Sequence, residues 1–231
     1  MLVSHRYRFI YTKTLKTAGT SVESFFERFC MPDGEWEMSH ARDEYVSPTG
    51  IIGFRGVKRS ESDKWWNHMP AAAIKRQLGE EIWNSYFKFC VVRNPFDKCI
   101  SAFEHFGKGR RTGLNALLST FRTIGMTSDQ RRFLAFVKNS PPVDCDKYIM
   151  NGEFCLNDVI RYESLESDID RICKILSIEF DPKFLPRLKG KTRRPNATPQ
   201  ALYTAKARQQ VASTFEFELK HFGYEFPLST P

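Results

Sequence analysis

The sequence lacks several features by which whole classes of protein are recognised. It has no run of about 18 consecutive apolar residues, which a membrane-spanning helix requires. Its first residues do not form a charged start followed by an apolar core and a cleavage site. Its six cysteines show no CxxC pair and no histidine-paired metal spacing. We therefore expect a soluble, cytoplasmic protein with buried reduced thiols, no disulfide framework and no bound metal.

The chain also lacks internal repeats, low-complexity segments and blocks of like charge. Its 231 residues suit one domain, residues 1–231, with a sizeable core. The formal charge of +8 favours a polyanionic partner, which includes nucleic acid, an anionic membrane or a small ligand with several phosphate-like groups; a merely basic surface is the alternative. The densest basic patch, residues 189–194, is short. We predict no nucleic-acid and no membrane partner, with nucleic-acid binding through this patch as the rival hypothesis.

Hydrophobic periodicity and turn signals predict strands that alternate with helices. The Asn151-Gly152 pair predicts a hairpin turn, and residues 31–62 are expected to be irregular. The predicted strands are 7–13, 87–92 and 159–162, and the predicted helices are 22–29, 71–78, 95–106, 129–137, 165–176 and 200–222. This alternation predicts an α/β fold with a central parallel sheet flanked by helices, in which ligands bind at the carboxyl ends of strands.

The first candidate anion site is the segment Lys16-Thr-Ala-Gly-Thr-Ser21, between the first predicted strand and the first predicted helix. A loop of small residues before a helix exposes backbone N–H groups, and the helix dipole adds positive charge. Lys16 would add a full charge, and Thr20 and Ser21 would add hydroxyls. The lysine precedes the only glycine, so the loop is not a Walker A motif, and a kinase or NTPase is disfavoured. A loop that simply turns the chain is the alternative.

The second candidate follows the strand predicted over 87–92. Arg93 leaves the end of this strand with a planar donor fork suited to a phosphate, and Ser101 lies in the second turn of the next predicted helix. Asn94 can cap that helix. An arginine that pairs with a neighbouring acidic side chain is the alternative explanation for Arg93.

Together, the KTAGTS loop and the later VVRNPFD…SAF segment resemble the sulfotransferases that use 3′-phosphoadenosine 5′-phosphosulfate (PAPS). The resemblance is to the carbohydrate branch, which contains the heparan sulfate 2-O-sulfotransferases and many small soluble bacterial relatives. It extends to residues 68–75, 159–165 and 222–226. It implies a single P-loop-like α/β domain that produces adenosine 3′,5′-bisphosphate and needs no metal.

The resemblance also implies roles for individual residues. The 5′-phosphosulfate would be held by Lys16, Thr17, Ala18, Gly19, Thr20 and Ser21. The 3′-phosphate would be held by Arg93 and Ser101, and a basic segment that closes over the cofactor matches Lys191, Thr192 and Arg193. In catalysis, Lys16 would neutralise the bridging oxygen of the leaving phosphate, and His68 would be the general base. The other candidate bases are His105, Glu44 and Glu104.

The acceptor is predicted to be a polar small molecule or a saccharide that carries a hydroxyl. Transfer to an amine or carbamoyl nitrogen is the alternative reaction. The acceptor pocket is expected among the aromatic residues Trp36, Tyr45, Trp65 and Trp66. Acidic residues in 33–37 and 43–44 would suit a cationic natural product. Relatives often carry His and Pro at the positions of Lys13 and Leu15, and some carry a second histidine at the position of Trp66.

Overall fold

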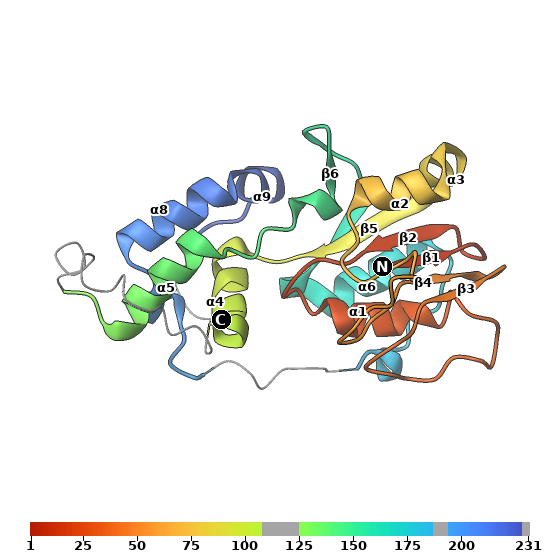
Figure 1. The fold of residues 1–231 in the computed structure, drawn as a ribbon, viewed down its shortest axis with the longest axis horizontal. Coiled ribbons are helices and arrows are strands. Elements are labelled where there is room, and N and C mark those ends of the chain that lie inside the picture. Colours follow the sequence, from red (N-terminus) through yellow and green to blue (C-terminus); the bar gives the residue numbers. More distant parts are fainter. Residues whose placement is uncertain (108–124, 187–193, 228–231) are drawn as a thin grey trace. The chain divides into compact units, whose positions relative to one another are not determined.

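The computed structural model of the protein describes residues 1–107, 125–186 and 194–227, and it divides into two compact units. Unit 1 comprises residues 1–92 and 144–188, and unit 2 comprises residues 93–143 and 189–231. Figure 1 shows the elements of both units, and we describe each unit by itself. The expectation of one domain over residues 1–231 stays a prediction, since two compact units can belong to one folded domain.

Unit 1 is built on a six-stranded sheet with the order β3-β4-β1-β2-β5-β8. The strands are β1 (Leu2–Ser4), β2 (Phe9–Thr12), β3 (Tyr45–Ser47), β4 (Gly50–Ile52), β5 (Phe87–Val92) and β8 (Asp158–Arg161). The three strands β2, β5 and β8 run parallel, and β1, β3 and β4 extend the sheet by antiparallel pairing. The α/β fold class with a central sheet flanked by helices is confirmed.

Helices cover this sheet. The chain leaves unit 1 after residue 92 and re-enters it at residue 144, and a β-hairpin lies shortly after that point. The helical elements are α1 (Gly19–Glu27), α2 (Ala71–Leu78), α3 (Glu80–Ser85), α6 (Leu165–Ile175) and the 3₁₀ helices η2 (Cys145–Lys147), η3 (Tyr162–Ser164) and η4 (Pro182–Phe184). The hairpin strands are β6 (Ile149–Met150) and β7 (Glu153–Phe154), joined at Asn151-Gly152 as predicted. Both turn residues have positive φ, which asparagine and glycine adopt most readily.

The core of unit 1 explains why α1 forms where it does. Phe25 and Phe26 of α1 are fully buried, and the Phe26 ring lies 5.0 Å from the ring of Phe89 on β5. Ile169 and Ile172 of α6 belong to the same cluster, so α1 and α6 pack against one hydrophobic core with the strands. The helix was predicted from residue 22 but begins at Gly19. The last three residues of the predicted anion loop therefore form the first turn of α1.

Unit 2 is helical and has its own aromatic core. The helices among its described residues are α4 (Pro95–Phe106), α5 (Ser128–Asn139), α7 (Pro199–Leu202), α8 (Ala205–Thr214) and α9 (Glu216–Phe222). Phe103 of α4 and Phe133 of α5 meet edge to face, with ring centroids 5.4 Å apart. The core is completed by residues of α8 and its end, including Val211 and Phe215.

The prediction of one long helix over 200–222 is wrong, because this segment forms three separate short helices. The Thr198 hydroxyl accepts a hydrogen bond from the Ala201 N–H at the start of α7. The Thr204 hydroxyl accepts one from the Ala207 N–H at the start of α8. A threonine in this geometry is a helix N-cap, so each marks a new helix rather than an interior position. Phe215 then separates α8 from α9.

Candidate active site

The site is built where β2 and β5 end. These strands are parallel neighbours, and Thr12 pairs with Cys90, so their carboxyl ends lie at the same edge of the sheet. The chain leaves β2 into residues 13–18 and then enters α1. Lys16 and Ala18 both have φ of 59°. This left-handed conformation is unusual for residues with a Cβ, and it persists only where the surrounding structure enforces it.

The turn leaves a row of backbone donors at the helix start. Ala18 is the N-cap of α1, and its side chain offers no capping hydrogen bond. The N–H groups of Thr17, Ala18, Gly19 and Thr20 donate to no acceptor in residues 1–107, 125–186 and 194–227. Four consecutive N–H groups without an acceptor at the N-terminus of a helix are suited to an anion with several oxygens.

Gly19 has little space around it. A Cβ at this position would lie 3.2 Å from the Lys13 side chain and 3.2 Å from the Tyr11 hydroxyl. The Tyr11 hydroxyl donates a hydrogen bond to the Gly19 carbonyl at 3.3 Å. The glycine therefore lets the first turn of α1 lie close against β2, with its N–H groups at the end of the strand.

A buried hydroxyl pair attaches the loop to β5. The Thr14 hydroxyl donates to the Val91 carbonyl at 2.5 Å, and it lies 2.8 Å from the Thr17 hydroxyl. Because the only hydroxyl proton of Thr14 goes to Val91, Thr17 is the donor in the second bond. The Thr17 side chain therefore serves the loop, and its backbone N–H is the part of Thr17 that is available to a ligand.

His68 lies beside the same loop. Its Nδ1 is 3.1 Å from the Lys13 carbonyl oxygen, and its φ is 56°. A carbonyl oxygen only accepts hydrogen bonds, so Nδ1 carries the proton and Nε2 carries the lone pair. Burial, and then the nearby Lys13 ammonium, lower the pKa of His68 from 6.5 to about 4. The imidazole is therefore neutral at neutral pH, in the tautomer that can take a proton at Nε2.

The second candidate lies in unit 2, directly after β5. Asn94 caps α4 as predicted, since its side-chain oxygen accepts from the Phe96 N–H at 3.0 Å. The Nε and Nη2 groups of Arg93 donate to the Asp97 carboxylate. An acidic partner for Arg93, which was the alternative explanation for this arginine, is thus present. Asp97 lies four residues after Arg93 and holds the guanidinium at the first turn of α4. The Ser101 hydroxyl donates to no acceptor within the described ranges.

Comparison with known proteins decides the family. Residues 1–225 match the family model described as "Sulfotransferase family". The chain belongs to the sulfotransferase family. This sulfotransferase is also 27% identical over 110 residues to an uncharacterized protein of Archaeoglobus fulgidus, an alignment that covers 48% of this chain and 83% of the relative. No solved structure matches the chain. The resemblance found in the sequence is therefore confirmed at the level of the family, and with it sulfuryl transfer as the general activity.

Other site residues expected in the sulfotransferase have structural partners. The Glu104 carboxylate is buried and accepts from the Arg194 guanidinium, with Nη2 to Oε1 at 2.8 Å. The Glu44 carboxylate accepts from the Trp65 N–H at 2.5 Å. His105 is in the last turn of α4, where its ring meets that of Phe106. The expected basic segment Lys191, Thr192 and Arg193 lies outside the described residues.

The aromatic residues expected around the acceptor have different environments. Trp65 is buried, and Trp36 packs edge to face on Phe184 beside the core of unit 1. Trp66 lies under the Arg59 guanidinium, 4.4 Å from the ring centroid. The Tyr45 hydroxyl donates to Glu35 at 3.2 Å. Trp36 and Trp65 therefore have the structural role that is common for tryptophan.

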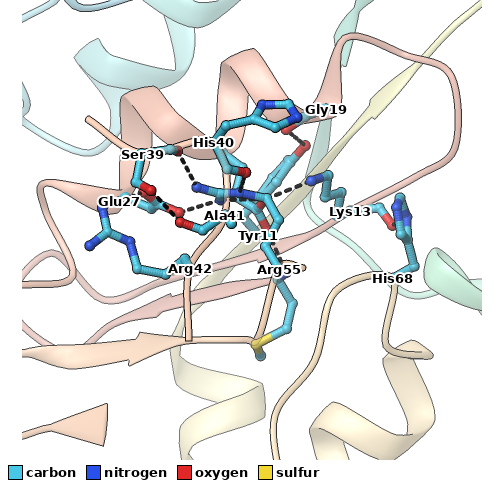
Figure 2. A network of polar contacts seen from close by, with 12 residues as sticks. Tyr11, Lys13, Gly19, Glu27, Ser39, His40, Ala41, Arg42, Arg55 and His68 are labelled. Carbon is cyan, nitrogen blue, oxygen red and sulfur yellow. Dashed lines mark hydrogen bonds and ion pairs between the residues drawn. The ribbon is translucent and has the colours of Figure 1, made fainter. Parts of the chain in front are cut away.

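A buried charge network beneath the loop was not found from the sequence. The Lys13 ammonium lies 2.6 Å from Glu23, and Arg55 pairs with both Glu23 and Glu27. The Met1 amino group lies 2.8 Å from Glu23. Burial alone would raise the pKa of Glu23, but these cations hold it well below its usual range. Figure 2 shows Lys13 between this cluster and the His68 ring, so the network supports the residue whose carbonyl orients His68.

The sequence contains one indication of this network, which is the spacing of its two glutamates. Glu23 and Glu27 are four residues apart on the helix predicted after the loop, and they alternate with buried aromatics. Charged residues within an apolar helix face indicate buried ion pairs, but the partner residue Arg55 is in a segment expected to be irregular. Its position could not be found by periodicity.

Two further features, a membrane-spanning helix and a cluster of metal ligands, are absent from the described residues. None of the helices in these ranges has the length and apolar character needed to cross a membrane. The same residues include no group of three or more His, Cys, Asp or Glu side chains arranged to hold a metal ion. All six cysteines carry free thiols, and burial raises the pKa of Cys99 and Cys173 to about 12.

Proposed function

We propose that this sulfotransferase uses PAPS and transfers its sulfuryl group to a hydroxyl of a polar small molecule or saccharide. The observation that supports this most strongly is the row of N–H donors from Thr17 to Thr20 at the start of α1. A phosphosulfate offers several oxygen acceptors, and its negative charge is favoured at the N-terminus of a helix. The residues of the loop therefore fit the 5′ end of the cofactor.

When bound, PAPS supplies an activated sulfuryl group and a phosphate leaving group. The Lys16 side chain, on the loop itself, would stabilise the negative charge on the phosphate that leaves. The unprotonated Nε2 of His68 removes the proton from the acceptor hydroxyl. The Lys13 carbonyl keeps the proton on Nδ1 and so keeps Nε2 ready to act as a base.

The low pKa of free His68 is consistent with this role. The Lys13 ammonium is one cause of the lowering, so a negative charge bound at the adjacent loop would act in the opposite direction. Binding of the cofactor is therefore expected to raise the pKa of His68 toward the range in which a general base is most effective. An NMR titration with and without adenosine 3′,5′-bisphosphate measures this change directly. An unchanged pKa in saturated protein would contradict a position of His68 next to the bound cofactor.

The 3′-phosphate is assigned to Arg93 and Ser101 of unit 2. The support is the chemistry of the groups: a planar guanidinium that suits a phosphate, and a hydroxyl two helical turns along the same segment. Lys191, Thr192 and Arg193 are proposed as further cofactor ligands on the family resemblance alone.

The proposal of a polar acceptor is supported by a groove in unit 1. This open groove of about 640 Å³ is lined by Pro70, two residues after His68, and by residues of α2. Its lining combines two basic and two acidic side chains, which are Lys75, Arg76, Glu80 and Asp146. These four side chains would be able to hydrogen-bond a hydroxylated acceptor, and the apolar side chains of Ile149 and Met150 complete the lining. Arg76→Ala is expected to raise the acceptor KM with little change in kcat.

The first test is calorimetric titration with adenosine 3′,5′-bisphosphate, with ATP plus Mg²⁺ and a short oligonucleotide as controls. One-to-one binding of the bisphosphate and weak binding of both controls would support the proposal. Preference for the oligonucleotide would instead support the nucleic-acid hypothesis, in which affinity falls steeply with salt. Absence of bisphosphate binding would refute the assignment of the loop.

Two variants then separate binding from catalysis. Arg93→Ala should weaken bisphosphate binding at least tenfold, because it removes a charged phosphate donor. His68→Asn should bind nearly as well as the wild type but lower kcat by about two to four orders of magnitude. Asparagine is chosen because it tolerates the left-handed backbone of residue 68. Equal loss of binding in both variants would contradict this division of roles.

A further inference from the structure

Asp144 is a buried carboxylate to which the proposed mechanism gives no role. Only 1% of the residue is exposed, and it is the residue at which the chain returns to unit 1 after the segment 93–143. It directly precedes the 3₁₀ helix η2. An aspartate in this position ordinarily caps the helix that follows, but the Asp144 side chain makes no such capping bond.

The Asp144 carboxylate instead contacts the anion loop. Its Oδ2 accepts a hydrogen bond from the Leu15 N–H at 2.5 Å. Leu15 directly precedes Lys16, the first of the loop's two left-handed residues. Asp144 is buried, and a hydrogen bond in a buried site is stronger than one exposed to water. The bond therefore fixes the peptide from which the strained part of the loop begins.

The loop depends on such contacts because its conformation is intrinsically unfavourable. Lys16 and Ala18 carry a Cβ and hold φ of 59°, which persists only where neighbouring groups over-determine the backbone. The Thr14 hydroxyl fixes the start of the loop to Val91. The bond from Leu15 to Asp144 is a second attachment, one residue further along and to a different part of unit 1.

We propose that Asp144 is a positioning residue for cofactor binding. Its carboxylate holds Leu15 so that Lys16 adopts the left-handed conformation and the N–H groups of residues 17–20 are available to the phosphosulfate. The inference rests on the proposed function for the identity of the ligand. A negative charge close to an anion site opposes binding of the anion, so the value of Asp144 lies in the position of its oxygen and not in its charge.

The variants are chosen to separate the position of the Asp144 oxygen from the negative charge of its carboxylate. Asp144→Asn keeps an oxygen acceptor at the same distance from the backbone and removes the charge. Asp144→Glu keeps the charge but adds a methylene, which displaces the oxygen. Asp144→Ala removes the acceptor. Asp170→Ala is the matched control, because Asp170 is an aspartate of unit 1 outside the proposed sites, and its partly exposed side chain pairs with Lys174.

The experiment measures the Kd of adenosine 3′,5′-bisphosphate by calorimetry and the hydrogen exchange of the Leu15 amide by NMR. We expect a Kd within about threefold of the wild type for Asp144→Asn and Asp170→Ala, and at least about tenfold weaker for Asp144→Glu and Asp144→Ala. The Leu15 amide should exchange faster in the Ala and Glu variants only. The melting temperature of each variant identifies one that fails to fold, and the Asn and Glu pair still tests the proposal if the Ala variant does not fold.

Two results would overturn the inference. One is an unchanged Kd and unchanged Leu15 exchange in Asp144→Ala or Asp144→Glu. The other is an equal loss of affinity in Asp144→Asn and Asp144→Glu, which would assign the effect to something other than the position of the oxygen. A wild-type protein that does not bind the bisphosphate would refute the proposed function instead, and Leu15 exchange would still show whether Asp144 holds the loop.

Discussion

The protonation of His68 gives the sharpest test of the site. Its pKa falls from 6.5 to about 4 in the folded protein, because of burial first and the Lys13 ammonium second. The unfolded chain therefore takes up a proton on this histidine as the pH falls below 6.5, whereas the folded protein does so only near pH 4. Between these values the unfolded state binds more protons, so acid destabilises the fold through His68.

The size of the effect follows from the two pKa values. On lowering the pH from 7 to 5, the free energy of unfolding should fall by about 2 kcal/mol on account of His68 alone. His68→Asn lacks the titrating group and keeps a residue type that tolerates the left-handed backbone. The free energy of unfolding of the wild type minus that of the variant should therefore decrease by about 2 kcal/mol as the pH falls from 7 to 5.

The assay is urea unfolding of both proteins at pH 7, 6 and 5, together with an NMR titration of the His68 ring. Other groups that titrate in this range affect both proteins alike and cancel in the difference. A stability difference that is independent of pH, together with a His68 pKa of 6 or above, would refute the reasoning. It would mean that the imidazole is open to water and does not donate from Nδ1 to the Lys13 carbonyl.

Two further predictions concern the charge network and the sheet. Lys13→Met should raise the pKa of His68 in the same NMR titration, since it removes a nearby positive charge; an unchanged pKa would show that the Lys13 ammonium does not contribute to the lowering. Gly50→Ala should destabilise the protein by about 3 kcal/mol in urea unfolding, because its Cβ would lie 2.3 Å from the Val3 carbonyl oxygen. Val46→Ala, at an exposed position of the neighbouring strand, should change stability by less than about 0.5 kcal/mol, and equal effects of the two substitutions would contradict the steric argument.

The features that the sequence predicts well are those set by local signals. The helix over 71–78 was predicted from propensity, the proline before it and the glycine after it, and the structure has α2 at Ala71–Leu78. The Asn151-Gly152 hairpin and the Asn94 cap depend on equally local chemistry. The position of the loop after Lys13, between a strand and a helix, was predicted from its small residues and the hydrophobic periodicity on either side.

The features that could not be predicted depend on contacts between distant segments. The use of the Thr17 hydroxyl within the loop depends on Thr14, and the position of Thr14 depends on Val91 in another strand. The pairing of Arg55 with Glu23 and Glu27 joins residues about 30 positions apart through a segment without periodicity. The helix breaks near residue 204 were misassigned because a single threonine can be either a cap or an interior residue.

The attachment of the loop to Asp144 has a consequence for the order in which the protein folds. The two bonded residues are 129 positions apart, and the bond from Thr14 to Val91 spans 77 positions. Contacts of such long range form late, because the entropy of closing the intervening chain must be paid first. During synthesis, the KTAGTS segment leaves the ribosome long before either partner exists. The proposed anion site is therefore expected to be among the last parts of unit 1 to mature, after its helix and strands have assembled.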